Sequence, residues 1–331
     1  MRFAPIALVI LTCLLLAAHV AAAACSGTDA VGKRTLRLAD GREVVVWYPA
    51  IPQAEQSARG RHDHEPIDDA PIANCPVRWP VVLFSHGVAG CSEQAPYITE
   101  EVARHGYVVA APNHRDAICG VVLRQKFPDG AGSTRPSFLD PGAWTSDAWR
   151  DRDTDLRQAL ALLRSDPAFA ARVDTDRVAL MGHSLGGYTV LGAAGGWPDW
   201  RIPGVRAVLA FAPFTQPLLA HRRLHDLQVP VMYQVAAWDF GITPAVVAAE
   251  GAFATSPKPR YLVEWGQAGH LLWTDLPCRA YRTSRDCLAA APAARQVDAY
   301  AIAFLDRYVK GLAAPLLDGG GAGLLTYRAQ R

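Results

Sequence analysis

A serine in a glycine-rich turn is the clearest sign of chemistry in this sequence. The motif GHSLGG at residues 182–187 follows the apolar run 178–181 and precedes a helix-compatible stretch at 188–194. A sharp turn between a strand and a helix holds its serine in a strained conformation and presents the hydroxyl at the helix N-terminus. The glycines leave room for such a turn. We therefore predict that Ser184 is a nucleophile; the alternative is a structural serine in a turn.

A serine hydroxyl becomes a good nucleophile only when a base removes its proton. In chains with this kind of elbow the order is serine, acid, histidine. His270 follows the strand-like run 261–263, where such a base should stand. His221 and His225 precede a strand, at its wrong end, and His183 lies inside the elbow. We predict that His270 is the base; the alternative is an ordinary loop histidine.

The base in turn needs a carboxylate that orients it. Asp239 stands just after the strand-like run 231–235, at its carboxyl end. Asp226 precedes the same run and would lie at the opposite edge of the sheet, while Asp275 comes after His270, out of order. We predict that Asp239 is the acid; the alternative is a helix-capping or surface aspartate.

A tetrahedral oxyanion needs two backbone N–H donors. One is the N–H after the nucleophile, which here belongs to Leu185. The other should come from the loop SHGVAG at residues 85–90, where Val88 is our candidate. We expect His86 in this loop to be structural, because His270 fills the role of the base better. The alternative is an ordinary glycine-rich turn.

The side chains expected around this site are neutral and mostly apolar, which suits an uncharged acyl or aryl ester. We expect Phe214 and Trp238 to contact substrate. Further candidates of the same character are Phe84, Val88, Phe240 and Trp273. The alternative is that some of these aromatic residues belong to the core.

Continuous apolar runs indicate the strands that must position these residues, because such runs are typical of strands buried on both faces. They lie at residues 81–84, 107–111, 178–181, 205–211, 231–235 and 261–263. Alternation with helical segments predicts βαβ units, hence a mostly parallel central sheet of about eight strands with helices on both faces. Runs at 35–39 and 43–48 around Asp40-Gly41 predict an antiparallel N-terminal hairpin. No large lid domain is expected.

Two helices are predicted from apolar residues at helical spacing. In the first, which Ser146 would cap, these residues are Trp149, Leu156, Leu160 and Leu163. In the second they are Val297, Ala301, Phe304 and Tyr308, with Asp298 on another face.

The N-terminus has the parts of a secretory signal peptide. A basic Arg2 is followed by an apolar run at 3–20 and a cluster of alanines at 21–24. We predict a signal peptide at 1–24, a catalytic domain at 25–312 and a flexible tail at 313–331. The protein would then be periplasmic or secreted, with no membrane span after signal removal. The alternatives are a retained anchor and a lipid on Cys25, for which the usual leucine three residues upstream is absent.

The cysteines agree with export, because six remain after the signal and an even number suggests disulfides. Cys278 and Cys287 are closest in sequence and close a short polar loop, so we predict that bridge. Weaker candidates are Cys91 with Cys119 and Cys25 with Cys75. The alternative is that some are free buried thiols.

Composition excludes some classes of protein. The 331 residues are 50% hydrophobic with a net charge of +2, which rules out a predominantly disordered chain. No basic block stands out, so we predict no nucleic-acid partner. The segment HDHE at 62–65 is a weak metal candidate, because two histidines in a polar loop are usually solvated. We predict neither a metal nor a cofactor.

Several segments together resemble a known family. FSHG (84–87), YVVAAPNH (107–114), the GHSLGG elbow, AWD (237–239) and AGH (268–270) resemble the predicted dienelactone-hydrolase group of α/β-hydrolases. That group is related to platelet-activating-factor acetylhydrolase and to cutinase-like polyester hydrolases, and the resemblance covers residues 33–311.

The resemblance has limits at three positions. True dienelactone hydrolases use cysteine where this chain has Ser184, so lactone chemistry is not implied. In the acetylhydrolases the acid follows the preceding strand, where this chain offers no carboxylate, so the placement of Asp239 resembles the cutinase-like branch. The aromatic substrate wall of those enzymes implies the same role for Phe214.

These observations predict an exported, monomeric serine esterase. It would hydrolyse small or medium neutral carboxylic esters through an acyl-enzyme on Ser184. The alternatives are a cutinase-like hydrolase of a polymeric ester and a catalytically silent binding protein on the same fold.

Overall fold

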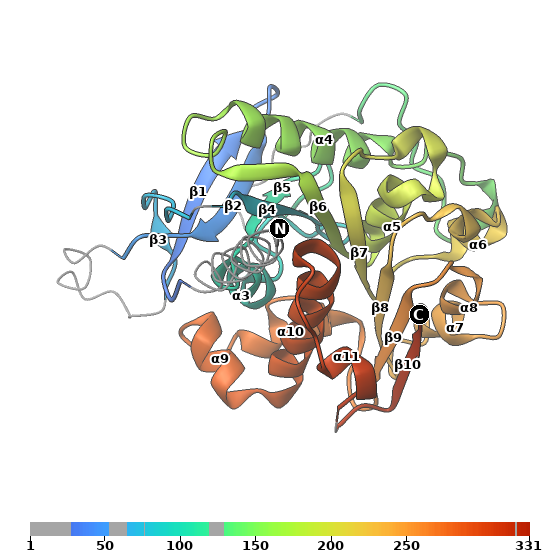
Figure 1. The fold of residues 1–331 in the computed structure, drawn as a ribbon. Helices are drawn as coiled ribbons and strands as arrows, with labels where there is room; N and C mark the ends of the chain where they lie inside the picture. The colour runs from blue at the N-terminus through green and yellow to red at the C-terminus, as the bar shows by residue number, and fades with distance from the viewer. Residues whose placement is uncertain (1–27, 53–64, 76, 119–128, 322) are drawn as a thin grey trace, which may run out of the picture.

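A single sheet runs through the molecule in the computed structural model, which describes residues 28–52, 65–75, 77–118, 129–321 and 323–331. The strand order is β10-β9-β8-β7-β6-β4-β5-β2-β1-β3 (Figure 1). The strands are β1 (Val31–Arg37), β2 (Glu43–Pro49), β3 (Ile67–Asp68), β4 (Trp79–Ser85), β5 (Val108–Pro112), β6 (Val173–His183), β7 (Val205–Phe211), β8 (Val231–Ala236), β9 (Arg260–Trp265) and β10 (Thr326–Gln330).

The six strands β4 to β9 are parallel to one another, while β2 pairs antiparallel with β1 and β5, and β10 pairs antiparallel with β9. The predicted mostly parallel sheet and opening hairpin are confirmed. The sheet has ten strands rather than about eight. The short β3 and the C-terminal β10 account for the difference.

Helices cover both faces of the sheet. They are α3 (Pro96–Arg104), α4 (Arg150–Ser165), α5 (Leu185–Leu191), α6 (Gln216–Ala220), α7 (Thr243–Val247), α8 (Ala252–Thr255), α9 (Ser284–Ala290), α10 (Pro292–Leu305) and α11 (Leu316–Gly319). On one face α4 and α5 pack over the sheet, and on the other α3 and α10 do so (Figure 1). Along β4, Val81 and Leu83 belong to the hydrophobic core under α4 and α5, while Val82 and Phe84 belong to the core under α3 and α10. Period-two alternation of an all-apolar strand thus builds both layers.

The C-terminal residues 313–331, predicted as a flexible tail, are ordered where the structure describes them. β10 pairs antiparallel with β9, placing Tyr327 opposite Val263. The Tyr327 hydroxyl donates to the Leu317 carbonyl at 2.8 Å, which ties β10 to α11. Gly320 follows the end of α11 with φ 70°, and a Cβ there would lie 2.8 Å from the Tyr327 ring, so glycine is required at this position.

The two predicted helices form, but two residues differ from expectation. Ser146 does not cap α4; Trp149 occupies that position with φ 60°, and Ser146 Oγ instead accepts a hydrogen bond from Arg150. Asp298 in α10 is 3% exposed, not on an open face. Neither of its carboxylate oxygens has a hydrogen-bond partner among the described residues, and burial raises its pKa well above the usual value.

Glu100 is a second acid buried on this side of the sheet, and it allows a test by pH. Burial raises its pKa from 4.5 to about 7. The folded state therefore holds this proton more tightly than the unfolded state, so the stability gained is full below pH 4.5 and is lost as pH rises through 7. The free energy of unfolding should fall by about 3 kcal/mol between these pH values because of Glu100, and we expect Glu100→Gln to abolish this decrease.

The measurement is urea unfolding of wild type and variant at pH 4.5, 6 and 8. The two free energies of unfolding should converge at low pH and separate at high pH, with the glutamine variant the more stable. A constant difference across this range would contradict the assignment.

Some predictions fall outside the described residues, namely the signal peptide at 1–24, Cys25, Cys119 and most of the HDHE segment. In the ranges that the structure does cover, no helix is both long enough and apolar enough to cross a membrane.

Candidate active site

The turn between β6 and α5 has the geometry expected of a nucleophile elbow. Ser184 lies at φ 56° and ψ −118°, a conformation that costs a non-glycine residue free energy. A Cβ on Gly186 would lie 1.9 Å from the Ser85 carbonyl oxygen, and one on Gly182 would lie 2.4 Å from the Gly186 oxygen. Only glycine fits at both positions, so the sequence GHSLGG is what permits the turn.

The three residues predicted as a triad lie in one hydrogen-bonded row. The Ser184 hydroxyl is 2.9 Å from His270 Nε2, and His270 Nδ1 is 2.6 Å from Asp239 Oδ2. Asp239 follows β8, and His270 follows β9 at the start of the short helix η5 (His270–Trp273). All three residues therefore stand at carboxyl ends of parallel strands, where sites of open α/β sheets lie. When His270 Nδ1 carries its proton and donates it in a hydrogen bond to Asp239, Nε2 is free to accept the serine proton.

The rejected candidates have other partners. Asp226 forms an exposed ion pair with Arg223 at 3.4 Å, and Asp275 pairs with Arg279 at 2.9 Å. Asp239, by contrast, is buried, and its only described side-chain partner is His270.

The loop after β4 lies directly against the nucleophile. A Cβ on Gly87 would come within 3.4 Å of Ser184 Cβ. Within the described parts of the chain, neither the Val88 N–H nor the Leu185 N–H donates to a protein acceptor. Both predicted oxyanion donors are therefore available to a ligand.

A pocket of about 300 Å³ opens at Ser184. Its lining residues are Gly87, Val88, Ala89, Gly90, Gln94, His183, Ser184, His270, Leu271, Thr274, Asp275, Leu276 and Arg279. Sequence reasoning placed Val88 here but missed the segment 271–279. The one signal for it was that these residues directly follow His270.

The predicted aromatic residues are not among those that line this pocket. Phe84 and Trp273 are fully buried in the core, because their side chains point to the layer of α3 and α10. Phe214 packs against other aromatic rings, whereas Trp238 and Phe240 are 60% and 80% exposed. The roles of Phe214 and Trp238 in substrate binding stay predictions.

His183 and Gln94, which the sequence did not reveal as part of the site, connect the loop at Gly87 with the segment at His270. His183 Nε2 donates to the backbone oxygen of His270 at 2.8 Å, and its Nδ1 accepts from Gln94 at 2.7 Å. The Gln94 side-chain oxygen accepts the Gly87 N–H at 2.7 Å. Burial, followed by the nearby His270, lowers the pKa of His183 to about 3, so it remains neutral, as this pattern requires.

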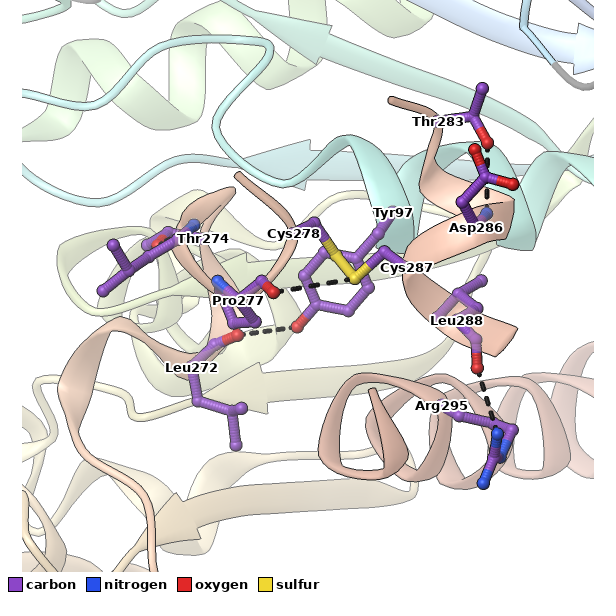
Figure 2. Close-up of a disulfide and its surroundings, with 11 residues drawn as sticks. Tyr97, Leu272, Thr274, Pro277, Cys278, Thr283, Asp286, Cys287, Leu288 and Arg295 are labelled. Atoms are coloured by element: carbon purple, nitrogen blue, oxygen red, sulfur yellow. Dashed lines mark hydrogen bonds between the residues drawn. A yellow bond between two sulfur atoms is a disulfide. The ribbon is translucent and has the colours of Figure 1, made fainter. Parts of the chain in front are cut away.

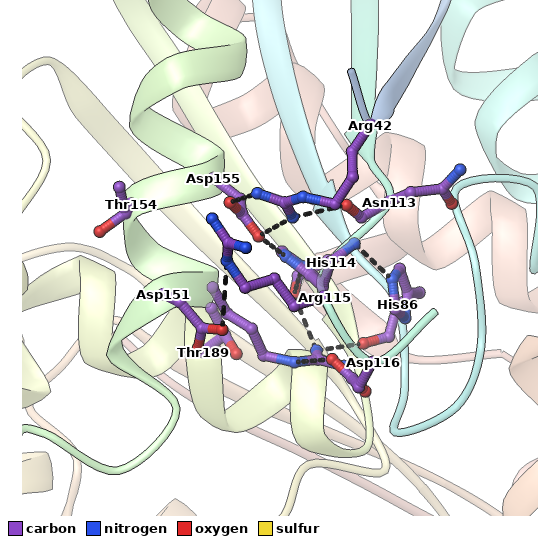
Figure 3. A network of polar contacts seen from close by, with 12 residues as sticks. Arg42, His86, Asn113, His114, Arg115, Asp116, Asp151, Thr154, Asp155 and Thr189 are labelled. Carbon is purple, nitrogen blue, oxygen red and sulfur yellow. Dashed lines mark hydrogen bonds and ion pairs between the residues drawn. The ribbon is translucent and has the colours of Figure 1, made fainter. Parts of the chain in front are cut away.

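A buried polar network lies beside the Val88 loop (Figure 3). His114 Nδ1 donates to Asp155 at 2.9 Å, and Arg42 also donates to Asp155. The Ser85 hydroxyl is 2.8 Å from His114 Nε2. His86 belongs to this network rather than to the triad, as predicted from the sequence. Burial lowers the pKa of both His86 and His114 well below the usual value, so both rings are neutral.

The predicted disulfide between Cys278 and Cys287 is confirmed (Figure 2). It joins the short helix η6 (Leu276–Cys278), which helps to line the pocket, to α9. Nearby, the Tyr97 hydroxyl of α3 donates to the Leu272 carbonyl at 2.7 Å. Cys75 and Cys91 are also disulfide-bonded, while their predicted partners lie outside the described residues.

We expect Cys278→Ala/Cys287→Ala to lower the melting temperature and to reduce turnover. Closing so short a loop contributes about 2–3 kcal/mol. Its loss should also loosen Leu276 and Arg279 at the pocket. Thermal unfolding and ester hydrolysis measure the two effects, and labelling of Ser184 by a fluorophosphonate is the control that the nucleophile is intact. An unchanged melting temperature would contradict this role for the bridge.

Metal binding has no group of ligands to support it in the described residues: no three His, Cys, Asp or Glu side chains lie close enough together to hold an ion.

Comparisons with known proteins find similar hydrolases for part of the chain. Residues 55–135 match the family model "Platelet-activating factor acetylhydrolase, isoform II". The chain is 26% identical to platelet-activating factor acetylhydrolase of Bos taurus over 139 residues, covering 34% of this chain and 31% of the bovine protein. The protein of the same name from Canis lupus familiaris is 30% identical over 149 residues, covering 36% and 34%. The matches thus span about a third of the length of these relatives.

Among solved structures, the chain is similar to a ferulic acid esterase from Streptomyces cinnamoneus. The TM-score is 0.60 at 21% identity, covering 90% of this chain and 96% of that one. The fold is that of an α/β-hydrolase, and the predicted resemblance to a hydrolase group related to platelet-activating-factor acetylhydrolase is confirmed. The family-model match contains FSHG and YVVAAPNH but not the serine elbow.

Proposed function

We propose that this protein is a serine hydrolase of carboxylic esters. The observation that carries the proposal is the row Ser184–His270–Asp239, which ends at a pocket beside two available backbone N–H groups. The names of the similar proteins, an acetylhydrolase and a ferulic acid esterase, denote ester hydrolysis and support it.

The reaction uses the groups of this site and water. Ser184 Oγ attacks the ester carbonyl carbon while His270 Nε2 takes the hydroxyl proton. The carbonyl oxygen becomes an oxyanion that the Val88 and Leu185 N–H groups stabilise. The intermediate then expels the alcohol, which receives the proton from His270, and leaves an acyl group on Ser184. Water, deprotonated by His270, attacks the acyl carbon; the bond to Ser184 Oγ then breaks, His270 returns the proton to that oxygen, and the acid is released.

The pocket favours small or medium neutral esters. Val88, Leu271 and Leu276 supply exposed apolar surface, and the charges of Asp275 and Arg279 offset each other in an ion pair. A volume of about 300 Å³ is at the small end for ligand sites.

A polymeric ester is the second candidate substrate. Trp238 and Phe240 flank Asp239 and expose most of their apolar rings. Exposed apolar groups beside a site favour contact with an extended surface. The two candidates differ in whether soluble esters or a solid polyester is the better substrate.

We further propose that the protein is exported and is a monomer. The signal-like residues 1–24 and the disulfides support export. Size-exclusion chromatography with light scattering would test the second proposal.

The decisive experiment is a panel of chromogenic esters of increasing acyl length with the purified mature protein, run beside a polyester film. We expect the highest kcat/KM for short and medium acyl chains. Failure to hydrolyse every ester, together with no labelling by a fluorophosphonate, would refute the function and favour a silent binding protein.

A further inference from the structure

We infer that Arg152 and His86 are positioning residues that orient and polarise the Gly87–Val88 peptide group. This inference rests on the proposed function, in which the Val88 N–H stabilises the oxyanion. It adds two side chains outside the triad, and their effect on the reaction passes through one backbone amide.

The carbonyl oxygen of Gly87 accepts three hydrogen bonds. His86 Nδ1 lies 2.7 Å from it, Arg152 Nη2 lies 3.1 Å from it, and the Gly90 N–H donates to it at 3.1 Å. All three donors belong to the protein, and one carries a full positive charge. A backbone carbonyl has two lone pairs, so this oxygen is saturated.

The direction of the Val88 N–H follows from that arrangement. A peptide group is planar and trans, so its N–H points opposite to its C=O. Fixing the Gly87 oxygen on Arg152, which is fully buried, turns the Val88 N–H away from the interior. Val88 and Ser184 both line the pocket. Hydrogen bonds to the carbonyl also strengthen the donor at the other end of the same amide.

Arg152 is itself fixed by partners in the same loop. Its Nη1 donates to the His86 carbonyl at 2.7 Å, and it pairs with Asp116 at 2.7 Å. Asp116 in turn accepts the Ala89 N–H at 3.1 Å. Burial raises the pKa of Asp116, but the charge and the hydrogen bonds of Arg152, together with the nearby His86 and His114, outweigh burial and hold that pKa below the usual value, so the pair stays ionised. One ion pair thus holds backbone groups of residues 86, 87 and 89.

His86 must carry its proton on Nδ1 to serve as the second donor. Its Nε2 accepts the backbone N–H of His114 at 3.0 Å, which fixes that tautomer. The His114 ring is held by Asp155 (Figure 3). Its Nε2 also lies 2.8 Å from the Ser85 hydroxyl. The buried network described above therefore ends on the Gly87 carbonyl.

This assignment gives a role to two motifs that the triad does not use. FSHG supplies His86 and Gly87, and the segment beginning YVVAAPNH supplies His114 and, two residues later, Asp116. Residues 55–135, which match the acetylhydrolase family model, include these motifs but not Ser184.

The test is Arg152→Lys. Lysine keeps the positive charge. It lacks the branched guanidinium group that contacts the His86 and Gly87 carbonyls and the Asp116 carboxylate at the same time. Losing one oxyanion donor costs about 10²–10³ in kcat, so misdirecting it should cost about 10–100-fold. We expect this loss in kcat with KM within twofold. The pH profile should not move, because His270 and Asp239 are untouched. Binding of a trifluoromethyl ketone, which forms a tetrahedral adduct, should weaken by the same factor.

Arg157→Lys is the matched control. Arg157 lies on the same helix, α4, and pairs with Asp153 at 2.8 Å, with no described contact to the loop. We expect its kcat to equal that of the wild type. Should Arg152→Lys fail to fold, Asp116→Asn decides the question, because it leaves Arg152 in place but removes its ion-pair partner.

The outcomes separate this inference from the proposed function. A wild type that hydrolyses esters, with a folded Arg152→Lys or Asp116→Asn that retains full kcat, overturns the inference alone. A wild type that neither hydrolyses esters nor reacts with a fluorophosphonate overturns both. A loss of kcat accompanied by a shifted pH profile also overturns the inference, because it would place the effect on His270.

Discussion

Replacing Ser184 with alanine is expected to lower kcat by on the order of 10⁴–10⁶, because the acyl-enzyme can no longer form. The change removes only the hydroxyl, whose described side-chain partner is His270 Nε2 at 2.9 Å. Alanine must adopt the same positive φ as serine, so the strain of the elbow is unchanged. Ester turnover and thermal unfolding of the purified variant measure the two consequences.

The Ser184→Ala variant should melt within a few degrees of the wild type. It should also fail to react with a fluorophosphonate, which excludes a contaminating esterase as the source of wild-type activity. Turnover near that of the wild type would show that the nucleophile lies elsewhere.

Asp239→Asn is expected to cost on the order of 10⁴ in kcat while preserving shape. The His270 Nδ1–H donates to Asp239 at 2.6 Å, so the carboxylate fixes which ring nitrogen faces Ser184. An asparagine can instead donate to Nδ1, which moves the ring proton to Nε2 and removes the base. Steady-state kinetics across pH would show the loss.

Asp226→Asn is the control for that experiment. Asp226 stands before β8, whereas Asp239 stands after it, so Asp226 lies at the opposite edge of the sheet. It pairs with Arg223 at the surface. Its substitution should leave kcat unchanged. A mild effect at Asp239 and a severe one at Asp226 would mean that the acid is misassigned.

Sequence could predict the row Ser184, Asp239 and His270 because each residue is marked by its immediate neighbours. Each follows a short apolar run, and strands of a parallel sheet end at one edge. Hydrophobic runs locate those strand ends well. The positions of the three residues after such runs were therefore enough to predict that they lie close together in the fold.

Residues that act across the fold left no such mark. Gln94 meets His183 from a distant part of the chain, and Arg152 reaches the Gly87 loop from the middle of a helix pattern. Their roles depend on which helix covers which strand end, and periodicity does not contain that information. The placement of Phe84 and Trp273 at the pocket was wrong for a related reason: a position next to a strand end does not say toward which layer a ring points, and both rings point into the core.

The C-terminal strand β10 covers the outer edge of β9. Without β10, the outer edge of β9 would present a row of unpaired N–H and C=O groups, which can template a strand from another molecule. β10 satisfies that edge, and it carries the exposed Arg328, which donates to the Val247 carbonyl at 3.2 Å. A charged, five-residue strand is a poor template for further pairing. We therefore expect that removal of the last residues of the chain would favour aggregation, although they lie outside the triad and its pocket.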